Sequence, residues 1–108
     1  MRIYLESSET WIHVRFHHER NEDKICITPS GNKRYKRGEE TYTECKISFA
    51  DALLNEYFIG RSYVNPVDQF CAEIGRRKAL DRAIFEARSA GELSSKEERE
   101  IWVGYFSR

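Results

Sequence analysis

The first half of the chain alternates apolar and polar residues with the period of a β-strand. Residues 11–18 place Ile12, Val14 and Phe16 on one side, and the intervening positions carry a tryptophan, two histidines and an arginine. Successive side chains of a strand point to opposite faces, so this pattern predicts a strand with one buried face. A longer alternation over residues 41–49 repeats the signal. These two segments predict an antiparallel sheet.

Shorter segments extend the predicted sheet. Residues 24–28 follow the polar, turn-like residues 19–23 and predict a hairpin with the preceding strand, and residues 3–5 predict another strand. The basic stretch Lys33–Arg37 contains one aromatic residue, a mixture also found in proteins that bind single-stranded nucleic acids. Such stretches are more often solvated loops, and we interpret this one as a loop.

The period changes to that of a helix near Ser48. Ser48 and Asp51 resemble a capping box, and apolar residues then recur at helical spacing before Gly60. The pattern predicts a short helix lying on the sheet. The apolar residues of this predicted helix are Leu53, Leu54, Tyr57 and Phe58.

A long helix is predicted from Pro66 to about Ser89, with Asn65 as its cap. It carries two apolar stripes, displaced by roughly 160° on a helical wheel. Since one small sheet does not cover both stripes, the helix either bends at Gly75 or contacts different neighbours on opposite sides, and we expect the second stripe to contact a partner subunit. The first stripe comprises Val67, Phe70, Cys71 and Ile74, and the second comprises Leu80, Ala83, Ile84 and Ala87.

A final helix follows a second capping-box signal at residues 94–97 and carries the apolar residues Ile101, Trp102, Tyr105 and Phe106 on one face. These elements predict an α+β fold, in which an N-terminal antiparallel β-sheet is followed by two to three C-terminal helices. We expect a single domain over residues 1–108, with a sheet region over residues 1–49 and a helical region over residues 50–108.

Composition narrows the possible classes of protein. The 108 residues include 18 basic and 18 acidic side chains, so no global positive field marks a DNA-coating protein. An aromatic content of 13% favours a folded chain over a disordered one. Three cysteines without C-x-x-C spacing, no signal peptide and no apolar run of about 20 residues favour a reduced, cytoplasmic protein without a membrane partner.

Four cations follow the predicted helix cap: Arg76, Arg77, Lys78 and Arg82. Free backbone N–H groups at a helix start and nearby guanidinium groups favour phosphate as a ligand. The short amide of Asn65 suits a base or ribose. The simpler interpretation is that these cations form a solvated face paired with neighbouring carboxylates.

The sequence gives little support for metal binding or catalysis. His13 and His17 are separated by about 13 Å along a strand, too far to bind one metal ion without further ligands, so we expect no metal site. With Trp11 and Arg15 they either line an aromatic and cationic ligand surface or pack beneath a helix, and the sequence does not decide between these arrangements. Familiar catalytic motifs are missing from the sequence, so we expect neither enzymatic activity nor a cofactor.

One segment resembles a family of small phage-encoded proteins, the first family of Thoeris anti-defence proteins. The matching residues are Asn65-Pro66-x-Asp68-x-Phe70-x-x-x-x-Gly75-Arg76-x-x-Ala79-Leu80-x-Arg82-Ala83. The resemblance implies a sheet followed by helices, assembly into homodimers or higher homo-oligomers, and sequestration of cyclic ADP-ribose signals made by bacterial TIR-domain immune enzymes. Some members of that family also trap cyclic oligonucleotides at a separate site. They bind their ligands without cleaving them.

The resemblance also implies ligand-binding residues. Asn65 and Arg82 match an asparagine and an arginine of the family's pocket. Phe58 and Arg15 are candidates for its aromatic and second arginine contacts, because each belongs to an element expected to adjoin the long helix. Arg77 and Lys78, taken from the cations that follow the predicted helix cap and not from the resemblance, complete the predicted set.

The expected function is therefore sequestration of a cyclic ADP-ribose isomer or a cyclic oligonucleotide in the cytoplasm of an infected bacterial host cell, with no stable nucleic-acid partner. An alternative is a protein inhibitor of a bacterial defence nuclease, similar to an anti-CRISPR protein. That function favours an acidic face, for which Glu39, Glu40 and Glu44 offer only a short one. A nucleic-acid-binding regulator is the third possibility, and the neutral net charge counts against it.

Overall fold

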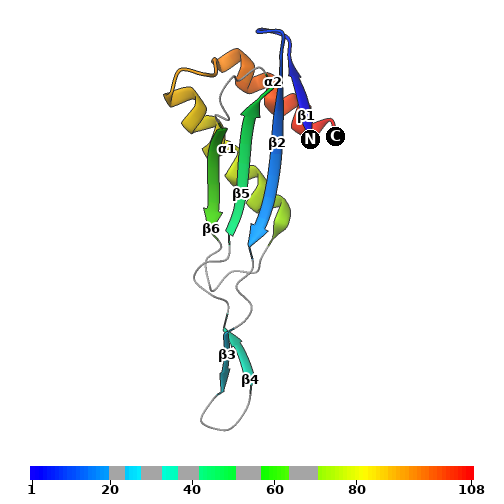
Figure 1. Ribbon diagram of the computed structural model, residues 1–108. Helices are drawn as coiled ribbons and strands as arrows, with labels where there is room; N and C mark the ends of the chain where they lie inside the picture. The colour runs from blue at the N-terminus through cyan, green and yellow to red at the C-terminus, as the bar shows by residue number, and fades with distance from the viewer. Residues whose placement is uncertain (20–23, 28–32, 37–41, 51–56, 64–70) are drawn as a thin grey trace.

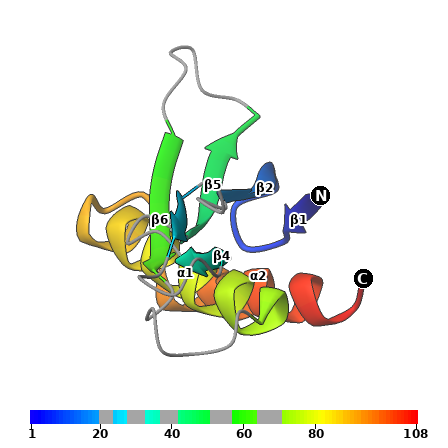
Figure 2. The ribbon, with the colours of Figure 1, turned by 90° about the horizontal axis from the view of Figure 1, so that it is seen from below.

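The computed structural model describes residues 1–19, 24–27, 33–36, 42–50, 57–63 and 71–108. Its main body is a four-stranded antiparallel sheet with two helices packed against one face (Figures 1 and 2). The predicted α+β class is confirmed. In sheet order the strands are β1 (Arg2–Leu5), β2 (Thr10–Glu19), β5 (Tyr42–Phe49) and β6 (Tyr57–Tyr63), and the helices are α1 (Ala72–Ser89) and α2 (Ser95–Phe106).

Two further strands, β3 (Lys24–Ile27) and β4 (Lys33–Lys36), pair antiparallel with each other in a separate sheet beyond the ends of β2 and β5 (Figure 1). The predicted hairpin between β2 and β3 is wrong, because β2 pairs with β5. Strand β5 pairs with β2 over eight residue pairs and matches its apolar alternation, whereas β3 is only four residues long. The interpretation of the basic stretch as a loop is also wrong, since residues 33–36 form β4.

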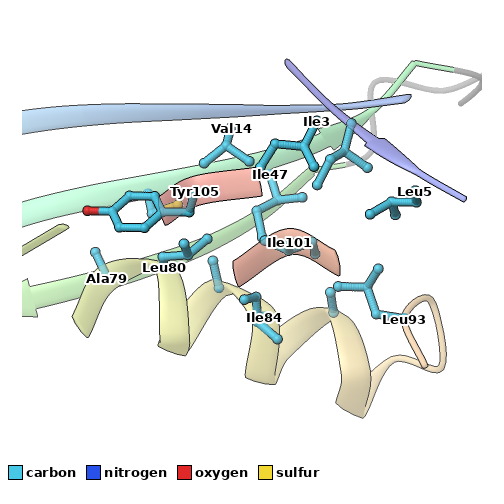
Figure 3. Close-up of a cluster of buried hydrophobic side chains, with 14 residues drawn as sticks. Ile3, Leu5, Val14, Ile47, Ala79, Leu80, Ile84, Leu93, Ile101 and Tyr105 are labelled. Carbon is cyan, nitrogen blue, oxygen red and sulfur yellow. The ribbon is translucent and has the colours of Figure 1, made fainter. Parts of the chain in front are cut away.

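The core lies between the sheet and the two helices (Figure 3). Ile12 and Val14 of β2 and Cys45 and Ile47 of β5 are fully buried, as the strand alternation predicts. Burial of each large aliphatic side chain contributes about 1.5–3 kcal/mol to folding. The predicted strands over residues 3–5 and 11–18 are therefore confirmed, as is the strand over residues 41–49 from Tyr42 onward, residue 41 lying outside the described residues.

The predicted short helix before Gly60 is wrong at both ends, because Ser48 belongs to β5 and Tyr57 begins β6; residues 51–56 lie outside the described residues. Gly60 does not end a helix. It faces α1 so closely that a Cβ atom at this position would lie 2.2 Å from the carbonyl oxygen of Ala79. The sheet consequently extends to Tyr63, and the predicted division into a sheet region and a helical region at residue 50 is wrong.

The predicted continuous helix from Pro66 is wrong at Cys71, which has extended backbone angles, φ −124° and ψ 110°, immediately before α1. Residues 64–70, including the predicted cap Asn65, lie outside the described residues. A helix that begins at Ala72 does not present the first predicted apolar stripe as one surface, and Ile74 is 53% exposed.

The second stripe of α1 packs on the protein's own sheet. Leu80 and Ile84 are fully buried in the core of the single chain, together with the alanines of the same stripe (Figure 3). The expectation that this stripe contacts a partner subunit is therefore wrong. Gly75 makes the close approach of α1 possible, because a Cβ atom there would lie 2.5 Å from Oγ1 of Thr43 on β5. The helix continues through Gly75 to Ser89.

The turn between the helices is defined by hydrogen bonds at both ends. Gly91, at φ +77°, donates its N–H to the carbonyl of Arg88, and Glu92 donates to the carbonyl of Ala87, which closes α1 in a Schellman arrangement. The predicted capping box of α2 is confirmed: Ser94 Oγ accepts the backbone N–H of Glu97, whose carboxylate accepts the backbone N–H of Ser94. None of the helices among the described residues is long and apolar enough to span a membrane.

Candidate functional site

The face of the sheet opposite the helices carries aromatic and cationic side chains. We call it the open face: the even-numbered residues of β1 and β5 and the odd-numbered residues of β2 and β6, which share one side by strand register. No helix or strand of the described residues covers it (Figure 2). Trp11 and Arg15 therefore do not pack beneath a helix of the described chain. Four exposed aromatic residues of the protein lie here: Tyr4, Trp11, Tyr57 and Tyr63.

At one end of the open face, a cleft of about 630 Å³ lies between β1 and α2. We call it the β1–α2 cleft. Its volume is within the range of about 300–1,000 Å³ typical of small-molecule sites. One wall carries an aromatic pair from the sheet, Tyr4 and Trp11, whose ring centroids are 5.1 Å apart. The opposite wall is the exposed side of α2, which contributes Lys96, Arg99 and Glu100.

Packing of α2 against β1 forms the bottom of this cleft. Gly104 of α2 brings the helix close to Ile3, because a Cβ atom at Gly104 would lie 2.8 Å from Cγ2 of Ile3. Both residues line the cleft. The small residue thus fixes how closely the charged side of α2 approaches the aromatic pair.

Hydrogen bonds also tie the turn between β1 and β2 to α2. Ser7 donates its backbone N–H and its hydroxyl to Oε1 of Glu100, at 3.1 Å and 2.7 Å. Ser8 donates its hydroxyl to Oε2 of Glu97 at 3.0 Å, while the other oxygen of Glu97 caps the helix. These bonds span more than 80 residues of sequence and hold the two walls of the cleft in a fixed relation.

Three cations surround the β1–α2 cleft. The guanidinium of Arg2 lies over the ring of Trp11, at 5.1 Å from the ring centroid. Lys96 and Arg99 are exposed and form no ion pair within the described residues. Of the two carboxylates that line the cleft, Glu6 and Glu100, the second accepts hydrogen bonds from Ser7. Free guanidinium and ammonium groups beside an aromatic face suit a phosphorylated nucleotide.

A second charged cluster lies where the start of α1 meets the end of α2. The carboxylate of Glu73 accepts hydrogen bonds from Arg76 at 2.7 Å and from Arg77, Arg108 and the hydroxyl of Tyr105 at 3.1 Å each. The bond from Arg76 is the main cause that lowers the pKa of Glu73 to about 2, and the other donors add to it. Glu73 thus stays ionised and joins the two helices.

Arg77 and Lys78, two predicted ligand residues, lie on the helical layer. Arg77 donates to Glu73 and lies 5.1 Å from the ring centroid of Phe106. Lys78 is exposed on α1. Neither contributes to the β1–α2 cleft or to the open face.

Arg82 makes a structural contact. Its Nη1 donates a hydrogen bond to the backbone carbonyl of Arg61 on β6, the last strand of the sheet. This bond satisfies an acceptor at the sheet edge and fixes α1 against it. Asn65, the predicted partner of Arg82 in ligand binding, lies outside the described residues.

Phe58 and Arg15 lie on opposite faces of the sheet. Phe58 packs against the core, with its ring centroid 6.2 Å from that of Phe49. Arg15 belongs to the open face, opposite Lys46 in the register of β2 and β5. The structure therefore does not bring the described members of the predicted site together.

Sequence reasoning missed the residues of the β1–α2 cleft because they come from both ends of the chain. Arg2, Tyr4, Lys96 and Arg99 belong to no local motif. The signal available in the sequence was the polar side of two amphipathic elements: the alternating residues of β1 and the charged face of α2. For metal binding, no group of three or more potential ligands was found in the described part of the chain.

Comparison with known protein families, with curated proteins and with solved structures finds no match for this chain.

Proposed function

We propose that this protein binds a cyclic ADP-ribose-type or cyclic oligonucleotide signal in the β1–α2 cleft and sequesters it without cleavage. On this proposal it is a phage counter-defence protein acting in the cytoplasm of an infected bacterial cell. The observation that carries the proposal is the cleft itself, in which the aromatic pair Tyr4 and Trp11 faces the cations Lys96 and Arg99.

The cleft supplies both kinds of contact that a phosphorylated nucleotide requires. An aromatic ring provides a stacking surface for a base, and cations bind phosphate oxygens through charge-assisted hydrogen bonds. Arg2, held over the ring of Trp11, places a third cation beside the stacking surface. Each hydrogen bond to a charged group is worth about 1.5–3 kcal/mol and one stacked base about 1–3 kcal/mol. Two or three such bonds with one stacked base therefore contribute about 4–12 kcal/mol, a range that includes micromolar binding.

Sequestration rather than turnover agrees with the residue types in the cleft. No serine, cysteine or histidine lines the cleft among the described residues, and of its two carboxylates Glu100 accepts hydrogen bonds from Ser7 and supports the cleft wall. The walls are held by hydrogen bonds from Ser7 and Ser8 to α2, so the site is largely formed before a ligand arrives. A preformed site lowers the ordering cost of binding, and a sequestering protein needs slow release.

A homodimer or higher homo-oligomer remains part of the proposal, with a different interface from the predicted one. Leu80 and Ile84 are buried within the chain and are not available to a partner. The exposed aromatic residues of the helices outside the cleft, Phe85 and Phe106, are the ones that a second copy would cover.

The test is calorimetry and native mass spectrometry with cyclic ADP-ribose isomers and cyclic di- and trinucleotides. We expect one ligand class to bind to the wild-type protein, and Lys96→Gln with Arg99→Gln to weaken it by about 10- to 100-fold, as expected for the loss of one or two charge-assisted bonds. The loaded protein, when heated, should release the intact nucleotide. Recovery of a hydrolysed product, or no binding by any member of the panel, would refute the proposal.

Arg82→Ala is the matched comparison, because it removes a cation from α1 outside the cleft. If Arg82→Ala abolishes binding while the Lys96 and Arg99 variant binds normally, the ligand lies on α1, as the sequence predicted, and the cleft assignment is wrong. Urea unfolding of each variant separates loss of binding from loss of structure.

A further inference from the structure

The centre of the open face contains a pair of like charges. Arg15 of β2 and Lys46 of β5 are direct cross-strand neighbours on the same side of the sheet. Neither forms an ion pair within the described residues. Like charges directly opposite one another destabilise an antiparallel sheet, so the fold carries a cost here, and no described carboxylate forms an ion pair with either cation.

Aromatic side chains of β5 and β6 lie on the same face as this cationic pair. The Nζ atom of Lys46 lies 3.7 Å from the ring centroid of Tyr57. Further along the same strands, Tyr42 and Tyr63 are cross-strand neighbours with ring centroids 5.5 Å apart, and the guanidinium of Arg61 lies 4.8 Å from the ring centroid of Tyr42. Tyr57 and Tyr63 are 48% and 56% exposed, so their rings remain accessible.

The acidic groups of this surface are already engaged by neighbours. Glu44 accepts a hydrogen bond from Arg61 at 2.8 Å, and Glu19 lies 2.8 Å from the ring nitrogen Nε2 of His17. The surface therefore presents two unpaired cations between accessible aromatic rings, which is a positively charged strip on a chain of zero net charge.

We propose that the part of the open face formed by Arg15, Lys46, Tyr57, Arg61 and Tyr63 binds single-stranded nucleic acid. The phosphates lie along the cations of the two central strands, and bases stack on the rings of Tyr57 and Tyr63. Alternation of cations with aromatic rings on a flat surface is the chemistry by which proteins bind single strands without sequence preference. This function is distinct from nucleotide binding in the β1–α2 cleft, and it departs from the sequence-based expectation of no nucleic-acid partner.

The dimensions of the strip suit a short stretch of backbone. From Tyr57 to Tyr63 the strand rises about 20 Å, at about 3.3 Å per residue, which is room for about three nucleotides. A duplex does not fit this chemistry as well, because its bases are stacked on each other and offer no free faces.

Charge argues against a second copy of the chain as the occupant. In a two-fold symmetric dimer formed through this face, residues near the axis meet their own counterparts. Arg15 and Lys46 lie at the centre of the face and would then repel the same residues of the other copy. A polyanion instead removes the repulsion that already exists within one sheet.

The test is fluorescence anisotropy with labelled 12-nucleotide oligo(dT) and oligo(rU) on the full chain, with a 12-base-pair duplex as comparison. We expect single strands to bind with a dissociation constant of about 1–100 µM at low salt, and more tightly than the duplex. Contacts of Arg15 and Lys46 with two phosphates predict about a sevenfold loss of affinity between 50 and 200 mM salt. Absence of single-strand binding under these conditions overturns the proposal.

Arg15→Gln with Lys46→Gln is the decisive variant. It should weaken oligonucleotide binding by at least tenfold and make the salt dependence shallower. Arg15→Gln alone, which keeps the contact of Lys46 with Tyr57, should weaken binding and raise the urea midpoint, because it removes the cross-strand repulsion. Opposite effects on binding and on stability separate a ligand-binding role from a structural one. An increase in stability with unchanged binding overturns the proposal.

Two controls locate the effect. Arg88→Gln with Arg108→Gln removes the same number of cations from the helical layer and should leave oligonucleotide binding unchanged. The Lys96 and Arg99 variant of the cleft should also bind oligonucleotides normally, so failure of this inference and failure of the proposed function are distinguishable. If the free protein is a dimer that Tyr57→Ala with Tyr63→Ala converts to a monomer, the open face is a self-association surface and the nucleic-acid proposal is wrong.

Discussion

Replacement of Gly60 by alanine is the sharpest test of how α1 is placed on the sheet. A Cβ atom at this position would lie 2.2 Å from the carbonyl oxygen of Ala79 and 2.3 Å from the backbone nitrogen of Ala83. Ordinary van der Waals contact begins at 3.4 Å, so α1 has to move away from β6 by roughly 1 Å. Because the obstructing atoms are backbone, no side-chain rotation relieves the clash.

The size of the effect follows from two opposing contributions. Overpacking of a core typically costs about 1–3 kcal/mol, and a clash with backbone belongs at the upper end of that range. Alanine in a strand recovers about 0.5–1 kcal/mol relative to glycine, because glycine loses more backbone entropy on folding. We therefore expect Gly60→Ala to lower the free energy of unfolding by about 2–2.5 kcal/mol. A domain of this size has a total stability of about 5–15 kcal/mol, so the variant should still fold.

Equilibrium urea unfolding, followed by far-ultraviolet circular dichroism, measures this difference. With an m-value of about 1–3 kcal/mol/M, the midpoint should fall by about 0.7–2.5 M. Gly104→Ala is the matched control: its Cβ atom would meet only side-chain atoms of Ile3, which can move, and alanine gains about 1 kcal/mol in a helix. The control should remain within about 1 kcal/mol of the wild type. Equal midpoints for Gly60→Ala and the wild type would show that α1 does not pack on Gly60.

Two further predictions concern pH and thiol chemistry. The pKa of Glu73 is lowered from 4.5 to about 2, chiefly by Arg76, so the stability it contributes is present above pH 4.5 and is lost as pH falls toward 2. Urea midpoints should show Glu73→Gln less stable than the wild type at pH 7, with the difference shrinking toward pH 2; a constant difference would contradict the assignment. Burial raises the pKa of Cys45 to about 12, whereas Cys71 is exposed. In a Cys26→Ser variant a thiol reagent should therefore modify Cys71 in the native protein and Cys45 only on unfolding, and fast native modification of Cys45 would show that the core is open.

The strands and the last helix were predictable because their signals are local. The alternation at Ile12 and Val14 reports directly that one face of a strand is buried, and the capping box at Ser94 specifies the start of α2 within four residues. β6 escaped prediction because its buried side consists partly of Gly60 and Ser62, small residues that give no apolar alternation. The close contact of β6 with α1 requires small residues, and those residues remove the apolar alternation by which a strand is recognised in a sequence.

Pairings between distant segments were not predictable in the same way. β2 pairs with β5 across residues 20–41, and no local pattern distinguishes that partner from the nearer β3. The candidate site depends on the same kind of long-range contact. Arg2 and Arg99 line the same cleft only because α2 packs under β1. The cations of α1 are adjacent in sequence but make contacts in different parts of the structure.

The packing of α2 against β1 also bears on how the chain folds during synthesis. Ile3 and Leu5 of β1 share their core with Ile101 and Tyr105 of α2, which is made after β1. At about 5–20 residues per second, a ribosome needs at least several seconds to make the residues that lie between them. Throughout that interval α2 does not yet cover the apolar side of β1. The nascent chain should therefore expose an aggregation-prone apolar face of β1 until α2 has been made. Chaperones that hold extended apolar segments should influence the yield of the protein more than its final stability.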